Sequence, residues 1–75
     1  MEKIDTIVHV NQELDKPSRE GIEEILCKTP GIIDSKFCEN RHHLMNVVYD
    51  GEVTDGLSIL SQVRQSGLTA QLVGF

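Results

Sequence analysis

Hydrophobic residues alternate with polar residues in four stretches of the chain and recur at helical spacing in two others. Alternation is typical of a strand with one buried face, and a spacing of three to four residues is typical of an amphipathic helix. The pattern predicts a first helix over residues 16–28 and a second between Thr54 or Asp55 and Gly67. It predicts strands over residues 4–10, 32–38, 44–49 and 68–75.

Both helices have recognisable ends. Asp15 can cap the first helix, and Pro17 falls in its first turn, where a missing N–H costs little. Thr29-Pro30-Gly31 ends this helix because proline disfavours helical geometry in the residue before it. Gly67 is expected to stop the second helix in a left-handed conformation. The predicted apolar positions are Ile22, Ile25 and Leu26, extended by Ser18 and Thr29, in the first helix, and Leu57, Ile59, Leu60 and Val63 in the second.

The order of the elements, βαββαβ, is typical of an α+β ferredoxin-like fold with a four-stranded antiparallel sheet and two helices on one face. Right-handed crossovers predict the strand order 4-1-3-2. The 75 residues form one domain, residues 1–75. Alternation predicts that Val8, Val10, Phe37, Met45, Val47, Tyr49, Ala70 and Leu72 face the helices. It predicts that Ile7, His9, Lys36, Cys38, Leu44, Asn46, Val48, Val73 and Phe75 face away.

Composition excludes several classes of partner. The net charge is −5, from 7 Lys and Arg against 12 Asp and Glu. Nucleic acid and anionic membranes need a basic surface, so neither is expected as a partner. The sequence contains no apolar run of the roughly 18 residues that a membrane span needs, and its N-terminus does not resemble a signal peptide. These features predict a cytoplasmic location.

Catalytic motifs are missing from the sequence. It contains no Ser-His-Asp ordering, phosphate loop or nucleotide fingerprint. Glu20, Glu23 and Glu24 are expected to form a solvated helix face. The chain is therefore predicted not to be an enzyme, and no cofactor is required.

The two cysteines are predicted to remain thiols. Cys27 lies near the end of the first helix and Cys38 near the opposite end of the domain, on the other face of the sheet. A disulfide needs Cα atoms within roughly 7 Å, so the two are not expected to pair. Cys27 is expected to be partly buried and without a role.

Cys38, His42 and His43 form a C-x3-H-H arrangement at the second hairpin. Sulfur and imidazole together suit zinc or copper, including copper(I). The alternative is a solvated polar turn. If the metal site exists, Cys38→Ser should abolish tight zinc or copper(I) binding.

The outward face of the sheet is more apolar than a solvated face needs to be. Such patches often mark interaction surfaces, so a protein partner or a homodimer is expected there. His9 lies on the same face, where a pH-sensitive interface is a minor alternative. The predicted interface residues are Ile7, Leu44, Val48, Val73 and Phe75.

The whole chain resembles the heavy-metal-associated domain of copper chaperones, mercury carriers and metal-pumping ATPases. The resemblance rests on Thr29-Pro30-Gly31-Ile32, on Val47-Val48-Tyr49-Asp50, and on Ile59, Leu60, Val63 and Ser66-Gly67-Leu68. It implies that a Gly-Met-Thr-Cys-x-x-Cys metal loop would fall on residues 12–18. Asp15 and Ser18 occupy the two cysteine positions there, so the thiolate site of the family is not carried over.

A second family with the same element order is the ACT regulatory domain. Asp15-Lys16-Pro17 is similar to its short Asp-x-Pro segment, although Ser18 follows where glycine is usual. This resemblance implies a small-ligand sensor with its ligand between subunits.

Three functions therefore follow from the sequence. The preferred hypothesis is a small binding module that keeps the heavy-metal-associated framework without its thiol loop and acts through protein contacts or self-association. The alternatives are a copper or zinc carrier with a relocated site at Cys38, His42 and His43, and an ACT-like sensor.

Overall fold

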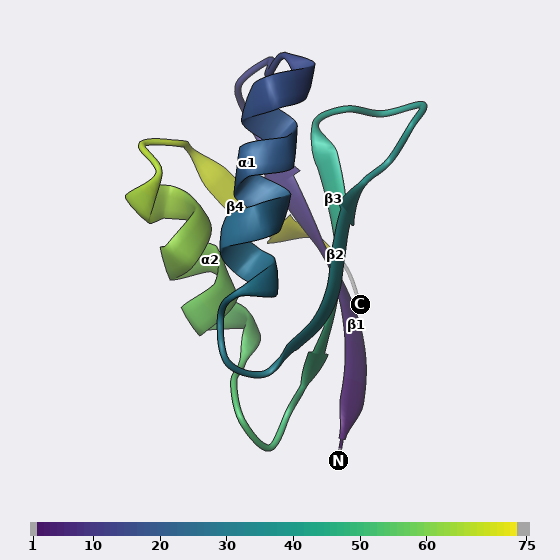
Figure 1. Ribbon diagram of the computed structural model, residues 1–75, viewed down its shortest axis with the longest axis vertical. Coiled ribbons are helices and arrows are strands. Elements are labelled where there is room, and N and C mark those ends of the chain that lie inside the picture. The colour runs from purple at the N-terminus through teal and green to yellow at the C-terminus, as the bar shows by residue number, and fades with distance from the viewer. Residues whose placement is uncertain (1, 74–75) are drawn as a thin grey trace.

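The computed structural model describes residues 2–73 and contains one antiparallel sheet with two helices (Figure 1). The sheet order is β2-β3-β1-β4, which confirms the order predicted from the sequence. The predicted ferredoxin-like arrangement is also confirmed. The elements are β1 (Lys3–Val10), α1 (Lys16–Cys27), β2 (Ile32–Phe37), β3 (Leu44–Asp50), α2 (Gly56–Gln65) and β4 (Ala70–Val73).

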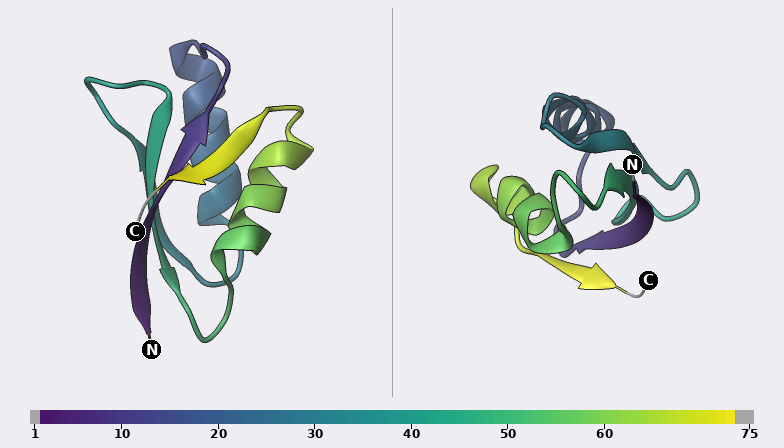
Figure 2. Two further views of the ribbon diagram at one scale, coloured as in Figure 1. Left: turned by 180° about the vertical axis from the view of Figure 1, so that it is seen from behind. Right: turned by 90° about the horizontal axis from the view of Figure 1, so that it is seen from below.

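Both helices cover the same face of the sheet, so the core is a single layer between them and the strands (Figure 2). The side chains predicted to face the helices are buried, except that Leu72 is only partly buried against the core. No helix of the described residues is both long enough and apolar enough to span a membrane. The core consists of Val8, Val10, Ile22, Leu26, Phe37, Met45, Val47, Tyr49, Ile59, Leu60, Val63 and Ala70.

Two predicted core positions are wrong. Ile25 is 47% exposed and Leu57 is 74% exposed. At about 100° per residue, Ile25 lies roughly 80° around α1 from the centre of the buried Ile22 and Leu26 pair, and Leu57 lies roughly 110° from the centre of the α2 stripe. Each side chain therefore projects past the edge of its buried stripe. The last strand begins at Ala70, two residues later than predicted, and the last two residues of the predicted strand lie outside the described residues.

The helix ends are as the sequence predicted. The Asp55 side chain accepts a hydrogen bond of 2.8 Å from the Ser58 N–H, so Asp55 is the cap of α2. Gly67 has a φ of +85° and Gly31 a φ of +91°, a conformation that residues with a Cβ rarely adopt. A Cβ on Gly31 would also lie 2.9 Å from Thr54 Cγ2, so the turn after α1 needs glycine for both reasons.

Side-chain hydrogen bonds fasten α1 to β2, which is an edge strand of the sheet. The Glu23 carboxylate accepts a hydrogen bond of 2.7 Å from the Phe37 N–H, and the Ser35 hydroxyl donates to the Glu23 carbonyl at 3.1 Å. Unpaired edge groups are a template for unwanted strand pairing. Glu23 therefore blocks part of this edge, a role that differs from the solvated face predicted for it.

We predict that Glu23→Ala lowers the free energy of unfolding by about 1–2 kcal/mol, because it leaves the partly buried Phe37 N–H without its acceptor. Glu24→Ala is the matched control, since Glu24 makes only an exposed 3.0 Å ion pair with Lys28. That pair is worth about 0.5 kcal/mol or less. Urea unfolding measures both variants, and equal losses would contradict the role given to Glu23.

Candidate functional site

One end of the domain collects the loops that follow β1, β2 and α2 (Figure 1). Backbone hydrogen bonds hold these loops together. The Val10 N–H donates to the His43 carbonyl at 2.8 Å, and the Asn11 N–H donates to the Thr69 carbonyl at 2.8 Å. This loop end therefore brings residues 11–15, 38–43 and 66–69 to one place, including the segment where the family resemblance puts a metal loop.

Asp15 and Ser18, at the two expected thiol positions, are bonded to each other. Asp15 is the cap of α1, and its side chain accepts a hydrogen bond of 3.0 Å from the Ser18 N–H. Hydrogen bonds from the Ser18 side chain and backbone lower the pKa of Asp15 below its ordinary value of 3.8. The Arg19 side chain donates a hydrogen bond of 2.7 Å to the Leu14 carbonyl and thereby ties the loop before α1 to the helix. The two residues thus stabilise the helix start.

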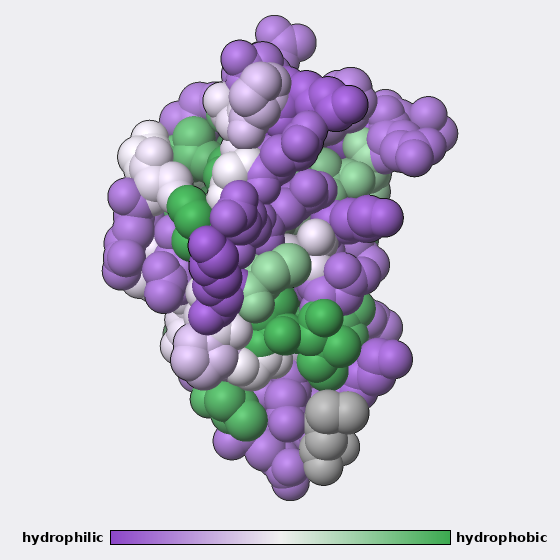
Figure 3. Space-filling view, in the orientation of Figure 1, coloured by the Kyte–Doolittle hydropathy of each residue, from purple (hydrophilic) through white to green (hydrophobic). Residues whose placement is uncertain are grey.

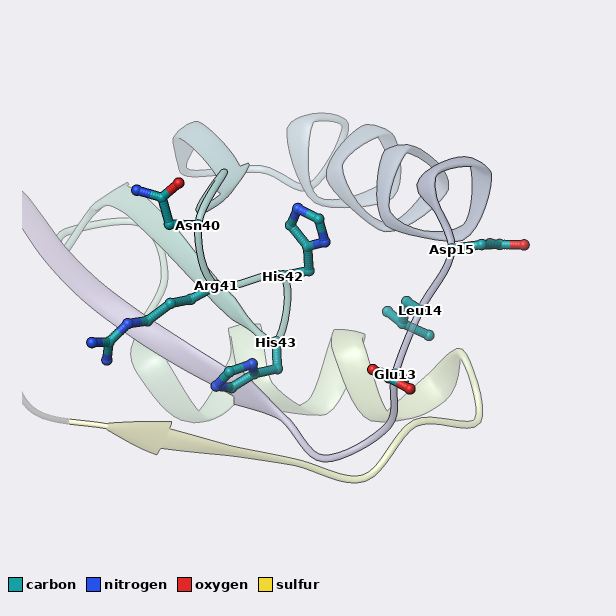
Figure 4. Close-up of a pocket in the computed structure, with 7 residues that line it drawn as sticks. All are labelled: Glu13, Leu14, Asp15, Asn40, Arg41, His42 and His43. Carbon is teal, nitrogen blue, oxygen red and sulfur yellow. The ribbon is translucent and has the colours of Figure 1, made fainter.

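A cavity of about 440 Å³ lies between this loop and the β2–β3 turn. Figure 4 shows that His42 and His43 point to different sides of the turn, His42 towards α1 and His43 towards β1. His42 also lines a separate depression beside α1, together with Cys38 and Lys16. The cavity is lined by Glu13, Leu14, Asp15, Asn40, Arg41, His42 and His43.

The predicted metal residues are not gathered into one cluster. His42 shares a depression with Cys38, and His43 is directed to the other side of the turn. Within residues 2–73, no group of three or more His, Cys, Asp or Glu side chains is arranged to hold a metal ion. Both cysteines are free thiols. Cys27 is exposed rather than partly buried, and its Sγ lies 3.4 Å from Ser35 Oγ.

His43 instead pairs with His9, a contact that sequence reasoning missed. The two ring centroids are 5.1 Å apart, with the ring planes at 71°. His9 Nδ1 lies 2.9 Å from Asn11 Oδ1. The register of β1 and β3, which pairs His9 with Leu44, places His43 directly beside that position. Antiparallel pairing of the two predicted strands would have brought their ends together, but strand alternation alone would have assigned the two rings to opposite faces of the sheet.

The face of the sheet opposite the helices, called the open sheet face, carries the predicted interface residues at neighbouring positions of adjacent strands. Val73 pairs with Ile7 across β4 and β1, and these side chains are 40% and 37% exposed. Leu44 and Val48 are half-buried on β3. Phe75 lies outside the described residues. The four described side chains form a small apolar area that the helices do not cover.

Carboxylates flank this apolar area. The sheet register pairs Val48 with Asp5 of β1 and with Asp34 of β2, and both aspartates are exposed. The next row pairs Asn46 with Ile7 and Lys36. The open sheet face is therefore aliphatic at its centre, acidic around Val48 and basic at one corner.

Apolar surface is also exposed away from the open sheet face. Figure 3, which views the molecule from the α1 side, shows a mostly hydrophilic surface whose largest hydrophobic area lies in its lower half. Ile33 is exposed in β2 at the register shift between Ile32 and Asp34, Val53 is exposed in the turn that follows β3, and Leu57 is exposed at the start of α2. Leu57 lies on α2, on the helix side of the sheet, and therefore offers a control position outside the apolar area of the open sheet face.

Several solved structures share this fold. The copper-binding domain of HMA7, a P-type ATPase, matches with a TM-score of 0.84 and 16% identity over 93% of each chain. Oxidized MerP from Ralstonia metallidurans CH34 matches with a TM-score of 0.85 and 10% identity over 96% of this chain and 99% of that chain.

The copper transporter domain Ccc2a of yeast matches with a TM-score of 0.80 and 20% identity over 93% of this chain and 94% of that chain. No model of a known protein family matches the sequence, and no curated protein matches it. This chain therefore has the fold of heavy-metal-associated domains, at identities that establish the fold alone.

We predict that Asp15→Asn lowers stability at neutral pH, and that the difference from wild type disappears in acid. A lowered pKa in the folded state means that the ionised carboxylate stabilises the fold above the ordinary value of 3.8. This contribution is lost as the pH falls through the lowered pKa. Urea midpoints measured from neutral pH to below this range test the sign, with Glu39→Gln in the exposed turn as control. A difference that persists in acid would contradict the prediction.

Proposed function

We propose that this domain is a small non-enzymatic binding module whose open sheet face docks a protein partner. The observation that carries the proposal is the apolar area formed by Ile7, Leu44, Val48 and Val73, on the face that both helices leave uncovered. Apolar areas with a polar rim commonly mark protein interaction surfaces. The proposal includes a cytoplasmic location, which the sequence predicts.

The loop end supports this function over thiolate metal transfer. A soft metal carrier needs thiolates, because sulfur ligands select copper(I). The positions that the family resemblance assigns to cysteine hold Asp15 and Ser18, and their side chains are used in capping α1. Hydrogen bonds within the chain hold the loop end together, so this part of the fold does not need a bound metal.

The charge around the open sheet face favours a partner that carries basic and aliphatic side chains. Asp5 and Asp34 stand on either side of Val48, and the chain has a net charge of −5. Complementary charges at a rim speed association and select partners. Two copies of this acidic chain would repel one another over the same surface, so a different, basic protein is the preferred occupant and a homodimer is the alternative outcome.

We predict that Val48→Asp abolishes binding at the open sheet face, because it replaces an aliphatic side chain of the apolar area with a carboxylate that would lose its hydration in the complex. Leu57→Asp is the matched control, since Leu57 is 74% exposed on α2. Sedimentation of each protein at high concentration measures self-association, and affinity capture compares the proteins retained by wild type and by the two variants.

A band retained by wild type and Leu57→Asp but lost with Val48→Asp supports a distinct partner. A dimer lost only in Val48→Asp supports self-association. Monomers throughout, with identical capture by all three proteins, would overturn the proposal.

A copper or zinc carrier is the second candidate, favoured by the similarity of the fold to a copper-binding domain and a copper transporter domain. In this hypothesis Cys38, His42 and His43 would hold the ion. His42 and Cys38 line one depression, so a turn rearrangement that brings His43 to them would be needed. The ACT-like sensor stays a prediction that no observation here tests.

We predict that reduced, untagged wild-type protein binds no copper(I), whereas the double variant Asp15→Cys with Ser18→Cys binds one ion per chain. The variant restores two thiols at the start of α1, where a helix N-terminus lowers thiol pKa and favours the thiolate. Native mass spectrometry with copper(I) measures both proteins. Copper(I) bound by wild type and lost in Cys38→Ser would instead establish the carrier.

A further inference from the structure

His9 and His43 hold their rings at a separation suited to sharing one metal ion. The ring centroids are 5.1 Å apart and the planes are inclined at 71°. In a tetrahedral complex with N–Zn bonds of about 2.0–2.1 Å, two imidazole centroids lie about 5 Å apart. The pair therefore has the spacing of a chelate before any ion is added.

Asn11 sets the tautomer of His9. Its Oδ1 atom lies 2.9 Å from His9 Nδ1 and can only accept, so the neutral ring donates from Nδ1 and carries its lone pair on Nε2. Histidines that bind metals usually donate their second N–H to a neighbouring acceptor, which fixes the ring and raises its basicity. Asn11 supplies that supporting bond here.

The backbone holds His43 beside His9. The His43 carbonyl accepts a hydrogen bond of 2.8 Å from the Val10 N–H, and the Leu44 N–H donates to the Arg41 carbonyl at 3.0 Å. These bonds join the end of β1 to the turn before β3. Backbone hydrogen bonds to β1 thus hold His43 in place, so its backbone needs little further ordering when an ion binds.

We propose that His9 and His43 form a two-histidine site for a divalent transition ion of the imidazole-binding group, Zn²⁺, Ni²⁺ or Cu²⁺, with water completing the coordination. The site shares His43 with the Cys38, His42 and His43 set, but its second ligand is His9 on β1 instead of Cys38 and His42. It does not depend on the proposed protein partner. Imidazole suits these ions and oxygen ligands suit Ca²⁺ and Mg²⁺, so the pair selects against the latter.

The surroundings tolerate a cation. Gln71, which pairs with His9 across β4, is neutral. Glu13, Asp15 and Arg41 line the same cavity as His43, so two carboxylates accompany one guanidinium. The chain as a whole carries a net charge of −5, which raises the local concentration of cations. Two ligands make an open site, so exchangeable rather than permanent binding is expected.

The test is calorimetric titration of reduced, untagged protein with Zn²⁺ and with Ni²⁺, against His9→Gln, His43→Gln and His42→Gln. We expect one ion per chain or per pair of chains in wild type. Binding should be lost in His9→Gln and in His43→Gln and kept in His42→Gln, the adjacent histidine that points towards α1. Asn11→Ala should weaken affinity by about 10-fold or more, as loss of a supporting bond does elsewhere.

A second measurement does not rely on variants that have to fold. Paramagnetic Ni²⁺ should broaden the imidazole NMR signals of His9 and His43 in wild type before those of His42. No ion bound by wild type would overturn the proposal. Binding that survives His9→Gln but is lost in Cys38→Ser would also overturn it, by assigning the ion to the Cys38, His42 and His43 set.

Discussion

The packing of two amphipathic helices against one face of a four-stranded sheet is the constraint on which the rest of this structure depends. A chain of 75 residues has few apolar side chains to bury, so a single core layer between the helices and the sheet holds the buried ones. The opposite face of the sheet is left without cover. The same arrangement directs the loops after β1, β2 and α2 to one end. Both candidate surfaces, the open sheet face and the loop end, therefore result from the packing of both helices on one face of the sheet.

Most of this fold could be predicted from the sequence, because strong local signals agreed with one another. The alternation in Val8, Val10, Met45 and Val47 assigned the buried face of the central strands, and all four are fully buried. Asp15 and Gly67 marked helix ends through capping and left-handed geometry. Such signals involve residues that are close in sequence, so they can be recognised from the sequence alone.

The errors arise where the position of a residue around a helix or across the sheet decides whether its side chain is exposed and what it contacts. Ile25 and Leu57 are apolar and close to the right spacing, yet each projects past the edge of its stripe and is exposed. Glu23 looked like a solvated carboxylate, but the edge of β2 gives it a backbone donor. His9 and His43 are 34 positions apart in sequence, and only the register of β1 and β3 shows that they meet. The predicted set of Cys38, His42 and His43 rested on sequence proximity. Cys38 and His42 do line one depression, but the turn directs His43 to the other side.

At the loop end, the stability of this fold does not depend on metal binding. A helix start needs an acceptor for its unpaired N–H groups, and a metal loop at the same place must supply thiolates instead. Asp15 meets the first requirement directly, with a carboxylate whose pKa is lowered by its bonds to Ser18. A chain with this cap can keep the heavy-metal-associated fold without an ion at that end. The remaining surfaces, the open sheet face and the His9–His43 pair, are then free to take on binding functions that the fold itself does not dictate.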